Sequence, residues 1–173
     1  MNFKNTCVEF ARSKIEIPPL SNAPFPQADS VERLMKITEL ITRKPVSKNE
    51  IASIFEFEER QASYYLNACK YLGLAEQRKV VSESVWVGSP TAKKIFASDK
   101  SSQIKHFCLL ILGIDSCAKT FLALQNNKSL SKKDVENIFN RSKDSLFCTG
   151  ETTKRRAKTV ESWAKWVDSV SSQ

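Results

Sequence analysis

The sequence predicts a mainly α-helical protein made of two tandem helix-turn-helix units, the first carrying a β-hairpin. Two similar stretches indicate the duplication, SKNEIASIF at 47–55 and SKKDVENIF at 131–139. Each opens with a capping-box pattern, in which a serine and an acid three residues later satisfy free backbone N–H groups at a helix start. The chain has only four glycines in 173 residues, which disfavours a turn-rich all-β fold and a glycine-rich phosphate loop.

The first 28 residues are expected to form an N-terminal arm or linker. Residues 18–28 contain four of the six prolines, and proline-rich chain is typically extended. From Asp29 onward, apolar residues recur at helical spacing up to about Pro45, which predicts the first helix of a unit spanning 29–99. The buried face of this helix is expected to hold Val31, Leu34, Ile37, Leu40 and Ile41.

A second and a third helix follow in this unit. The second starts at the capping serine Ser47 and is expected to bury Ile51, Ile54 and Phe55. The third covers 58–72, and its apolar residues also follow helical spacing. The expected buried stripe of this third helix is Ala62, Tyr65, Leu66, Cys69 and Leu72.

The segment after the third helix suggests the type of unit. Residues 74–87 contain two β-rich runs around Ser82-Glu83, which predicts a hairpin. Ser89-Pro90 then has the cap and first-turn residues of another helix. Three helices followed by a hairpin is the order of a winged helix, a variant of helix-turn-helix.

The second unit is assigned to residues 100–173 and repeats the three helices. A helix is predicted from Asp115, a second from the capping serine Ser131, and a third over 155–167. RRAKTVESWAKWV in this third helix aligns with RQASYYLNACKYL in the first unit. Its buried stripe is expected to be Ala157, Val160, Trp163, Ala164 and Val167. No hairpin is predicted after it, so this unit is a helix-turn-helix or a reduced winged helix, and a buried helix at 102–112 joins the two.

The outer face of the first unit's third helix is a candidate for DNA base recognition. In helix-turn-helix proteins this helix enters the major groove. Arginine pairs with guanine, asparagine with adenine, and serine with several base edges. The candidate base-contacting residues are Arg60, Ser63, Tyr64 and Asn67. The alternative is an ordinary solvated polar face.

A second set of residues is expected to contact phosphates or to flank the site. Cations cluster at the start of the second unit's third helix, where free N–H groups and the helix dipole also attract anions. Others lie beside the hairpin, where they would add affinity without sequence information. The phosphate or flanking set is Gln61, Arg78, Lys79, Thr152, Thr153, Lys154, Arg155, Arg156, Lys158 and Thr159. Here too the alternative is a solvated charged face.

The overall charge favours a polyanionic partner. The net charge is +8, and residues 99–173 account for +5 of it. The five cysteines form no C-x-x-C pair, and His106 is the single histidine, so we expect no metal, no cofactor and no histidine-based catalytic site. No apolar run reaches the roughly 18 residues of a membrane span, and no signal peptide is recognisable, so the expected location is cytoplasmic.

Two stretches resemble a known architecture. ERQASYYLNACKYLGLAE before the hairpin, and RRAKTVESWAKWV near the end, resemble the tandem winged-helix regions of restriction endonucleases and related restriction–modification proteins. The resemblance covers about residues 20–170 and implies recognition of a double-stranded DNA target. In that family a separate nuclease domain usually cuts the DNA, and the resemblance implies that such a domain or subunit lies outside this chain.

Three functions follow as hypotheses. The first is sequence-specific binding to double-stranded DNA, in the setting of a type II restriction endonuclease. The second is a winged-helix scaffold that binds other proteins through aromatic residues and the proline-rich arm. The third is an enzyme contained in this chain, for which the sequence offers no catalytic site.

Overall fold

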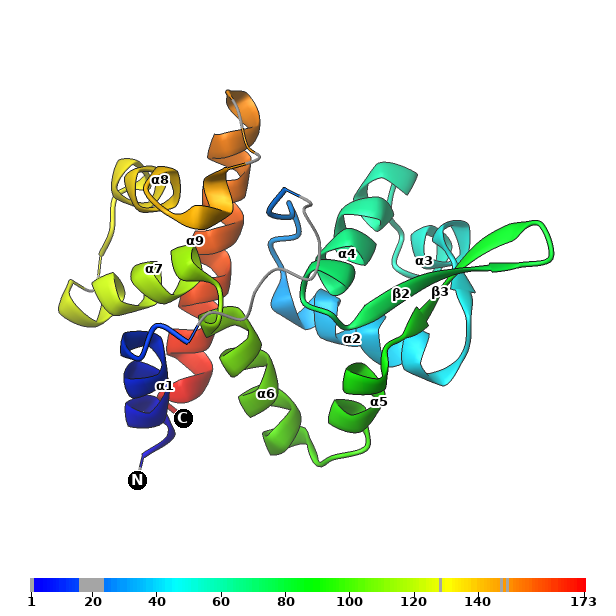
Figure 1. Cartoon of the computed structure of the whole chain (residues 1–173), viewed down its shortest axis with the longest axis horizontal. Helices are drawn as coiled ribbons and strands as arrows, with labels where there is room; N and C mark the ends of the chain where they lie inside the picture. The colour runs from blue at the N-terminus through cyan, green and yellow to red at the C-terminus, as the bar shows by residue number, and fades with distance from the viewer. Residues whose placement is uncertain (1, 16–23, 128, 147, 149) are drawn as a thin grey trace.

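Helices dominate the structure, and the predicted mainly α fold class is confirmed. The structure is a computed structural model that describes residues 2–15, 24–127, 129–146, 148 and 150–173 (Figure 1). Its described strands form one small antiparallel sheet of three. The elements gather into two lobes that lie side by side, with the sheet in the first of them (Figure 1).

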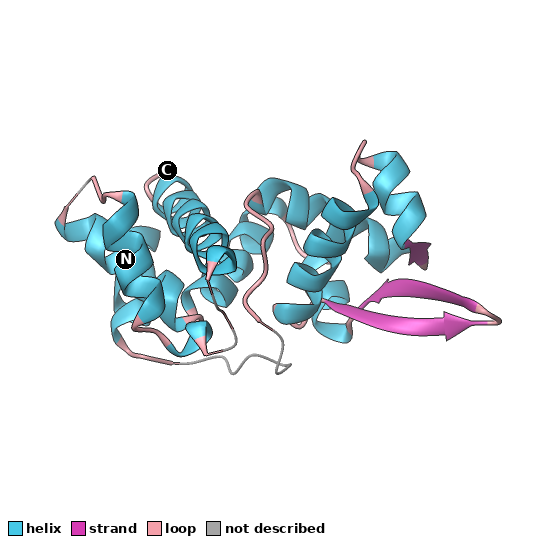
Figure 2. Cartoon of the chain, turned by 90° about the horizontal axis from the view of Figure 1, so that it is seen from above, coloured by secondary structure: helices cyan, strands magenta, loops and turns pink. Residues whose placement is uncertain are grey.

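The first lobe combines four helices with the sheet. It contains α2 (Val31–Arg43), β1 (Val46–Ser47), α3 (Lys48–Ile54), α4 (Glu59–Tyr71), β2 (Ala75–Val80), β3 (Glu83–Gly88) and α5 (Pro90–Phe96). The strand order is β1-β3-β2, so the hairpin is anchored to the lobe through β3. Its far end projects away from the helices (Figure 2). At Gly88 a Cβ would lie 2.5 Å from the Thr42 side chain, so glycine allows β3 to pass close to α2.

The second lobe is a bundle of helices around the long α9. It contains α1 (Phe3–Arg12), α6 (Lys100–Leu112), α7 (Asp115–Asn126), α8 (Lys132–Asn140), the 3-10 turn η1 (Lys143–Ser145) and α9 (Glu151–Ser171). The prediction of an arm over residues 1–28 is wrong for α1, which packs against α6, α7 and α9. Cys7 and Ala11 lie on one face of α1 and are buried. Burial of this apolar face explains why α1 packs against the second lobe. Residues 16–23 of the predicted arm lie outside the described residues.

Both predicted capping boxes are confirmed. The Glu50 N–H donates to Ser47 Oγ at 3.2 Å, and the Glu50 carboxylate accepts the Ser47 N–H at 2.9 Å. Ser131 and Asp134 repeat both bonds at 3.2 and 2.9 Å. Bonds to the charged carboxylates lower the pKa of both acids. The main cause is the Ser47 N–H for Glu50, and for Asp134 it is the Ser131 hydroxyl, which donates to Oδ2 at 2.6 Å. Each box fixes the start of the helix that precedes a third helix.

The buried stripes of both third helices are also confirmed. All five residues expected in α4 and all five expected in α9 are buried. One expectation for α3 is wrong, because Ile54 is 53% exposed. The helix ends at Ile54, and Phe57 beyond it stacks on Phe55 at 5.7 Å and on Tyr65 at 5.1 Å. The aromatic stack of Phe55, Phe57 and Tyr65 therefore joins the segment after α3 to α4.

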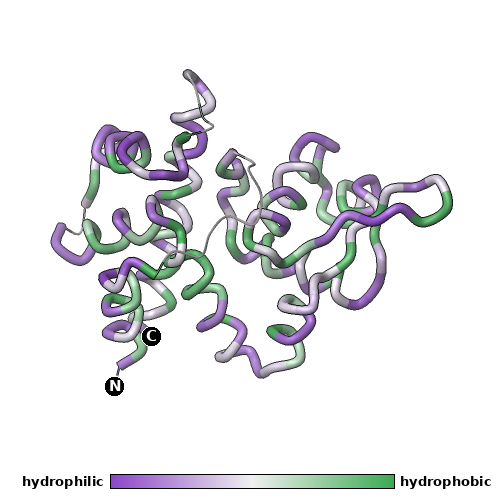
Figure 3. The backbone as a smooth tube through the Cα atoms, in the orientation of Figure 1, coloured by the Kyte–Doolittle hydropathy of each residue, from purple (hydrophilic) through white to green (hydrophobic). Residues whose placement is uncertain are grey.

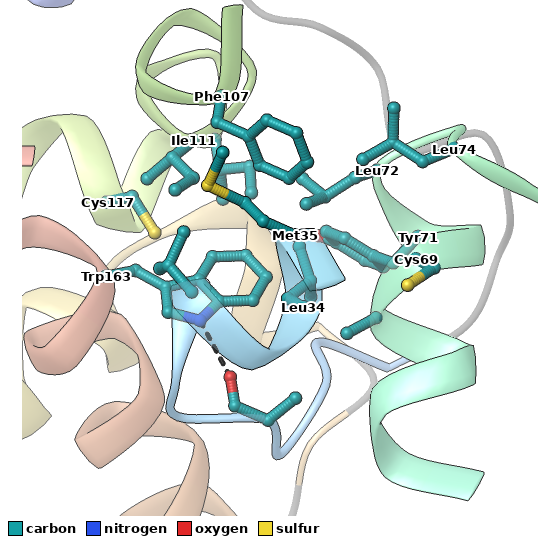
Figure 4. Close-up of a cluster of buried hydrophobic side chains, with 14 of the residues drawn as sticks. Leu34, Met35, Cys69, Tyr71, Leu72, Leu74, Phe107, Ile111, Cys117 and Trp163 are labelled. Atoms are coloured by element: carbon teal, nitrogen blue, oxygen red, sulfur yellow. Dashed lines mark hydrogen bonds between the residues drawn. The ribbon is translucent and has the colours of Figure 1, made fainter. Parts of the chain in front are cut away.

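Residues 24–28 connect the lobes, and Phe25, Pro26 and Ala28 of this segment are buried. Phe25 is 1% exposed and makes edge contacts with Tyr71 of α4, Phe139 of α8 and Trp163 of α9, at centroid distances of 5.4–5.8 Å. The Trp163 indole N–H donates to the Ala28 carbonyl at 2.7 Å (Figure 4). Side chains of α2, α4, α6, α7 and α9 meet in the same apolar cluster (Figure 4). This packing sets how far apart α4 and α9 stand.

Among the described residues no single helix is long and apolar enough to cross a membrane. Helices α6 and α7 meet the length and composition test only as a pair, and they are bent by 104° at the break between them.

Candidate nucleic-acid interface

Three adjoining depressions surround the exposed side of α4. The first, called here the interhelix groove, has a volume of about 370 Å³ and lies between the N-terminal parts of α4 and α9. Its lining residues are Gln27, Asp29, Glu58, Arg60, Gln61, Tyr64, Tyr65, Arg155, Lys158 and Thr159. Residues nearly 100 positions apart in the sequence therefore share one surface, which the sequence pattern alone does not reveal.

Cations and acids face each other across the interhelix groove. Arg60 comes from α4, whereas Arg155 and Lys158 come from α9, and all three side chains are exposed. The acidic residues are Asp29, whose carboxylate lies 3.7 Å from Lys158 Nζ, and Glu58 at the start of α4. The three cations and two acids leave the groove with one excess positive charge. The ion pair between Lys158 and Asp29 is exposed, so another anion can replace Asp29 as the partner of Lys158.

Arg60 and Tyr64 form a local pair on the exposed face of α4. The Arg60 Nε–H donates to the Tyr64 hydroxyl, and the guanidinium lies over the tyrosine ring, 5.5 Å from its centroid. Spacing of four residues places the two side chains one above the other on the helix. Because this bond uses Nε, it leaves the outer N–H groups of the guanidinium available for another acceptor.

Tyr65 holds the floor of the interhelix groove. It is 1% exposed, its hydroxyl donates to Asp29 Oδ1, and it accepts from the Ser30 N–H, both at 3.3 Å. Burial raises the pKa of Tyr65, which keeps the hydroxyl protonated as a donor. This contact ties α4 to the start of α2 and fixes the orientation of the face that carries Arg60.

The second depression, the arm pocket, adjoins the first at Gln27 and Tyr64. It has a volume of about 240 Å³ and is lined by Pro24, Phe25, Pro26, Gln27, Tyr64, Asn67, Lys70 and Arg156. Asn67 and Lys70 are exposed on the same face of α4. The Arg156 Nε–H donates to the Phe25 carbonyl, so this partly buried arginine is a structural tie between the lobes.

The third depression, the hairpin groove, lies between α4 and the hairpin and has a volume of about 520 Å³. It brings Ser63 and Asn67 of α4 together with Gln77 and Ser84 of the hairpin. Gln77 Nε2 donates to Ser84 Oγ at 2.6 Å across the two strands. On another side of the hairpin, Lys70 lines a further depression of about 610 Å³ with Arg78 and Lys79. The hairpin thus extends the polar surface of α4.

The predicted site residues divide by location. The interhelix groove gathers Arg60, Gln61, Tyr64, Arg155, Lys158 and Thr159. Thr159 lies at the flank of the groove as predicted, but it is 2% exposed and its hydroxyl donates to the Arg155 carbonyl at 3.4 Å, so the prediction that it contacts phosphate is wrong. Arg156 likewise uses its Nε on Phe25 and is only partly exposed. The first turn of α9 carries Thr152, Thr153 and Lys154, none of which lines the depressions described above.

Several residues at this surface were missed from the sequence. Lys70 lies three positions after Asn67 and continues the outward stripe of α4, so helical spacing alone could have identified it. Gln27 and Asp29 come from the segment before α2, and only the folded chain places them beside α4. No local pattern connects them to this face.

The surface offers no metal-binding cluster among the described residues. Within those ranges, no group of three or more His, Cys, Asp or Glu side chains could hold a metal ion. His106 is exposed on α6, with Nδ1 2.7 Å from the Ser102 carbonyl oxygen. This places the histidine on the flank of its helix.

The fold and surface define a two-lobed helical protein with a polar face built from both lobes. Residues 33–172 match a family model described as a domain of unknown function, DUF7226, and the chain belongs to this family. No significant match was found among curated proteins or among solved structures. The function must therefore be argued from the surface itself.

Proposed function

We propose that this protein binds double-stranded DNA and recognises its sequence. In this proposal α4 enters the major groove and presents Arg60, Ser63, Tyr64 and Asn67 to base edges. Arg155 and Lys158 of α9 bind the phosphates of the strand that borders the groove, and Lys79 of the hairpin binds phosphates on the other side.

The element order of the first lobe supports this proposal. Helix α2, strand β1, helices α3 and α4, and the β2–β3 hairpin follow one another, and β1 pairs with β3. This is the order of a winged helix, in which the third helix is the recognition helix. In the second lobe α7, α8 and α9 repeat the three helices, and the capping boxes occupy equivalent places. We therefore assign a winged helix to the first lobe and a helix-turn-helix to the second.

The main support for DNA binding is the interhelix groove, where candidate residues of both lobes lie together. Two candidate sets, one from each lobe, meet there: Arg60 and Tyr64 from α4, Arg155 and Lys158 from α9. The buried connection through Phe25 and Trp163 holds these helices at a fixed separation. Because the two helices are already held in place, they can contact bases and phosphates together with little loss of conformational entropy on binding.

The dimensions of the α4 face suit a short DNA site. Arg60 to Asn67 spans about 10 Å along the helix, at roughly 1.5 Å per residue, which equals about three base pairs at roughly 3.4 Å each. The outer N–H groups of Arg60 suit the two acceptors of guanine. The amide of Asn67, exposed between the arm pocket and the hairpin groove, suits adenine.

A role in restriction–modification is a narrower part of the proposal and rests on the resemblance of α4 and α9 to such proteins. In that setting this protein would select the DNA target, and a nuclease domain or subunit outside the chain would cut it. Magnesium-dependent cleavage by the purified 173-residue chain would contradict this division of work.

Replacing Arg60 by alanine tests base recognition by α4. We expect Arg60→Ala to relax the preference at one base pair and to cost about 1–3 kcal/mol of affinity for the preferred sequence, because a bidentate contact to one base is lost. The measurement is selection of bound duplexes from a random-sequence pool, followed by titration of the selected duplex.

The matched control is Arg12→Ala, which removes the same exposed side chain and charge from the end of α1. It should leave the selected sequence unchanged. If Arg60→Ala selects the same sequence with the same affinity as the unmodified protein, α4 does not recognise bases.

A further inference from the structure

The end of the β2–β3 hairpin exposes two valines. Val80 pairs with Glu83 across the strands, so Val81 and Ser82 form a two-residue loop. Val80 is 51% exposed and the Val81 side chain is fully exposed. This end of the hairpin is coloured as hydrophobic although the preceding part of β2 is hydrophilic (Figure 3). The end of the hairpin, the most projecting part of the first lobe, therefore exposes a small apolar surface.

Val81 also has an unfavourable backbone conformation. Its φ is +57°, a region that glycine adopts freely and that β-branched residues strongly avoid. Tight hairpin turns with positive φ at this position usually carry glycine, asparagine or aspartate. The fold gains nothing in return, because the exposed side chain packs against nothing in the first lobe. A strained residue without a packing role indicates that the side chain acts on a binding partner.

The hairpin is placed to reach DNA beside the α4 site. The hairpin groove joins Ser63 and Asn67 of α4 to Gln77 and Ser84 of the hairpin. Six residues of β2 cover about 20 Å at roughly 3.3 Å per residue. The major groove is about 12 Å wide, so a hairpin of this length that starts beside α4 can cross one strand to the next minor groove.

We propose that Val81, assisted by Val80, inserts between base pairs in the minor groove next to the α4 site and bends the duplex. The inference rests on the proposed DNA-binding function. Apolar side chains used as wedges unstack a base step and kink DNA by roughly 20–90°. Exposed cations Arg78 and Lys79 precede the tip on β2 and can hold the phosphates on either side of the wedge. Flexible pyrimidine–purine steps are the expected target, since they unstack most easily.

The test uses Val81→Asn, because asparagine accepts positive φ but is polar. End-to-end energy transfer is measured on a 20-base-pair duplex taken from the selected sequences, and 2-aminopurine is placed at the flanking pyrimidine–purine step. With the unmodified protein we expect a bend of at least about 20° and a rise in 2-aminopurine fluorescence. With Val81→Asn both signals should be lost, while the melting temperature rises by roughly 2–4 °C as the strain is relieved.

The control Ile15→Asn replaces another exposed apolar residue, 55% exposed after α1, and should leave both signals unchanged. If the unmodified protein and Val81→Asn bind and bend the duplex equally, the wedge is wrong and the DNA-binding proposal stands. Such a result would also be expected if the valines docked a protein. If the unmodified protein binds no duplex, the DNA-binding proposal is wrong and the wedge falls with it.

Discussion

Replacing Arg155 and Lys158 together by glutamine is expected to weaken duplex DNA binding by about 25-fold, whatever the sequence. Each exposed cation forms an ion pair with a phosphate worth about 1 kcal/mol, the upper end for surface ion pairs, which corresponds to about fivefold in affinity. Phosphate contacts carry no base information, so the preferred sequence should not change. Both side chains are exposed, and the Lys158 pair with Asp29 is a weak surface contact, so stability should change little.

The salt dependence separates this effect from a general loss of charge. Binding constants are measured by titration between 50 and 200 mM salt. The negative slope of log K against log salt should become shallower by about two in the double variant, because two phosphate contacts are lost. The control replaces Lys100 and Lys105 of α6 by glutamine, which removes the same charge on the side of the molecule away from the N-terminal end of α9 (Figure 1). Equal losses in both double variants would mean that the groove plays no specific part.

The second large effect is expected from Phe25→Ala, which should lower the free energy of unfolding by about 3–5 kcal/mol. Phe25 fills the space between α4, α8 and α9 with three aromatic edge contacts, and alanine leaves a cavity that rigid helices cannot close. The loss falls on the packing that holds the lobes together. We therefore expect the two lobes to unfold in separate transitions in urea.

Tryptophan fluorescence can follow the lobes separately. Trp86 lies in β3, whereas Trp163 and Trp166 lie in α9, so a Trp86→Phe background reports on the second lobe. Phe121→Ala is the control, because it removes an equally buried ring inside the second lobe. It should cost a similar free energy without moving α4 relative to α9. A single transition and a loss below about 1 kcal/mol for Phe25→Ala would contradict the assigned role.

The elements that sequence predicts best are those with short-range causes. The capping boxes at Ser47 and Ser131 depend on residues three apart, and both form. The buried stripes of α4 and α9 depend on helical spacing within one element, and every predicted member is buried. The prediction for Ile54 is wrong because α3 ends at this residue, and helical spacing does not indicate whether the last residue of a short helix is covered by the rest of the fold.

Features made by distant parts of the chain were predicted poorly. The sequence around α1 follows no repeat and predicts part of an arm, whereas its short apolar face docks on the second lobe. Prolines at 24 and 26 indicated extended chain, yet Phe25 between them is buried among aromatic residues. The proline content of this segment predicts its extended backbone but not that other elements pack over Phe25.

The candidate surface shows the same division. Outward positions such as Arg60 and Lys158 follow from helix geometry and are exposed as expected. Arg156 and Thr159 were assigned to the phosphate or flanking set from their place near the start of α9, and both instead bond backbone carbonyls, Arg156 that of Phe25 and Thr159 that of Arg155. The meeting of α4 and α9 in one groove depends on lobe packing, which no pattern in either helix encodes.

The salt dependence of duplex binding by the unmodified protein tests the central claim most directly. Contacts from both lobes to about four phosphates predict a slope of log K against log salt near −4, which is a loss of roughly 100-fold or more between 50 and 200 mM. The measurement is a titration of labelled selected duplex across that range. Affinity that is unchanged over the range, or no duplex binding at 50 mM, would contradict the account. A protein complex that survives high salt would then favour the scaffold alternative.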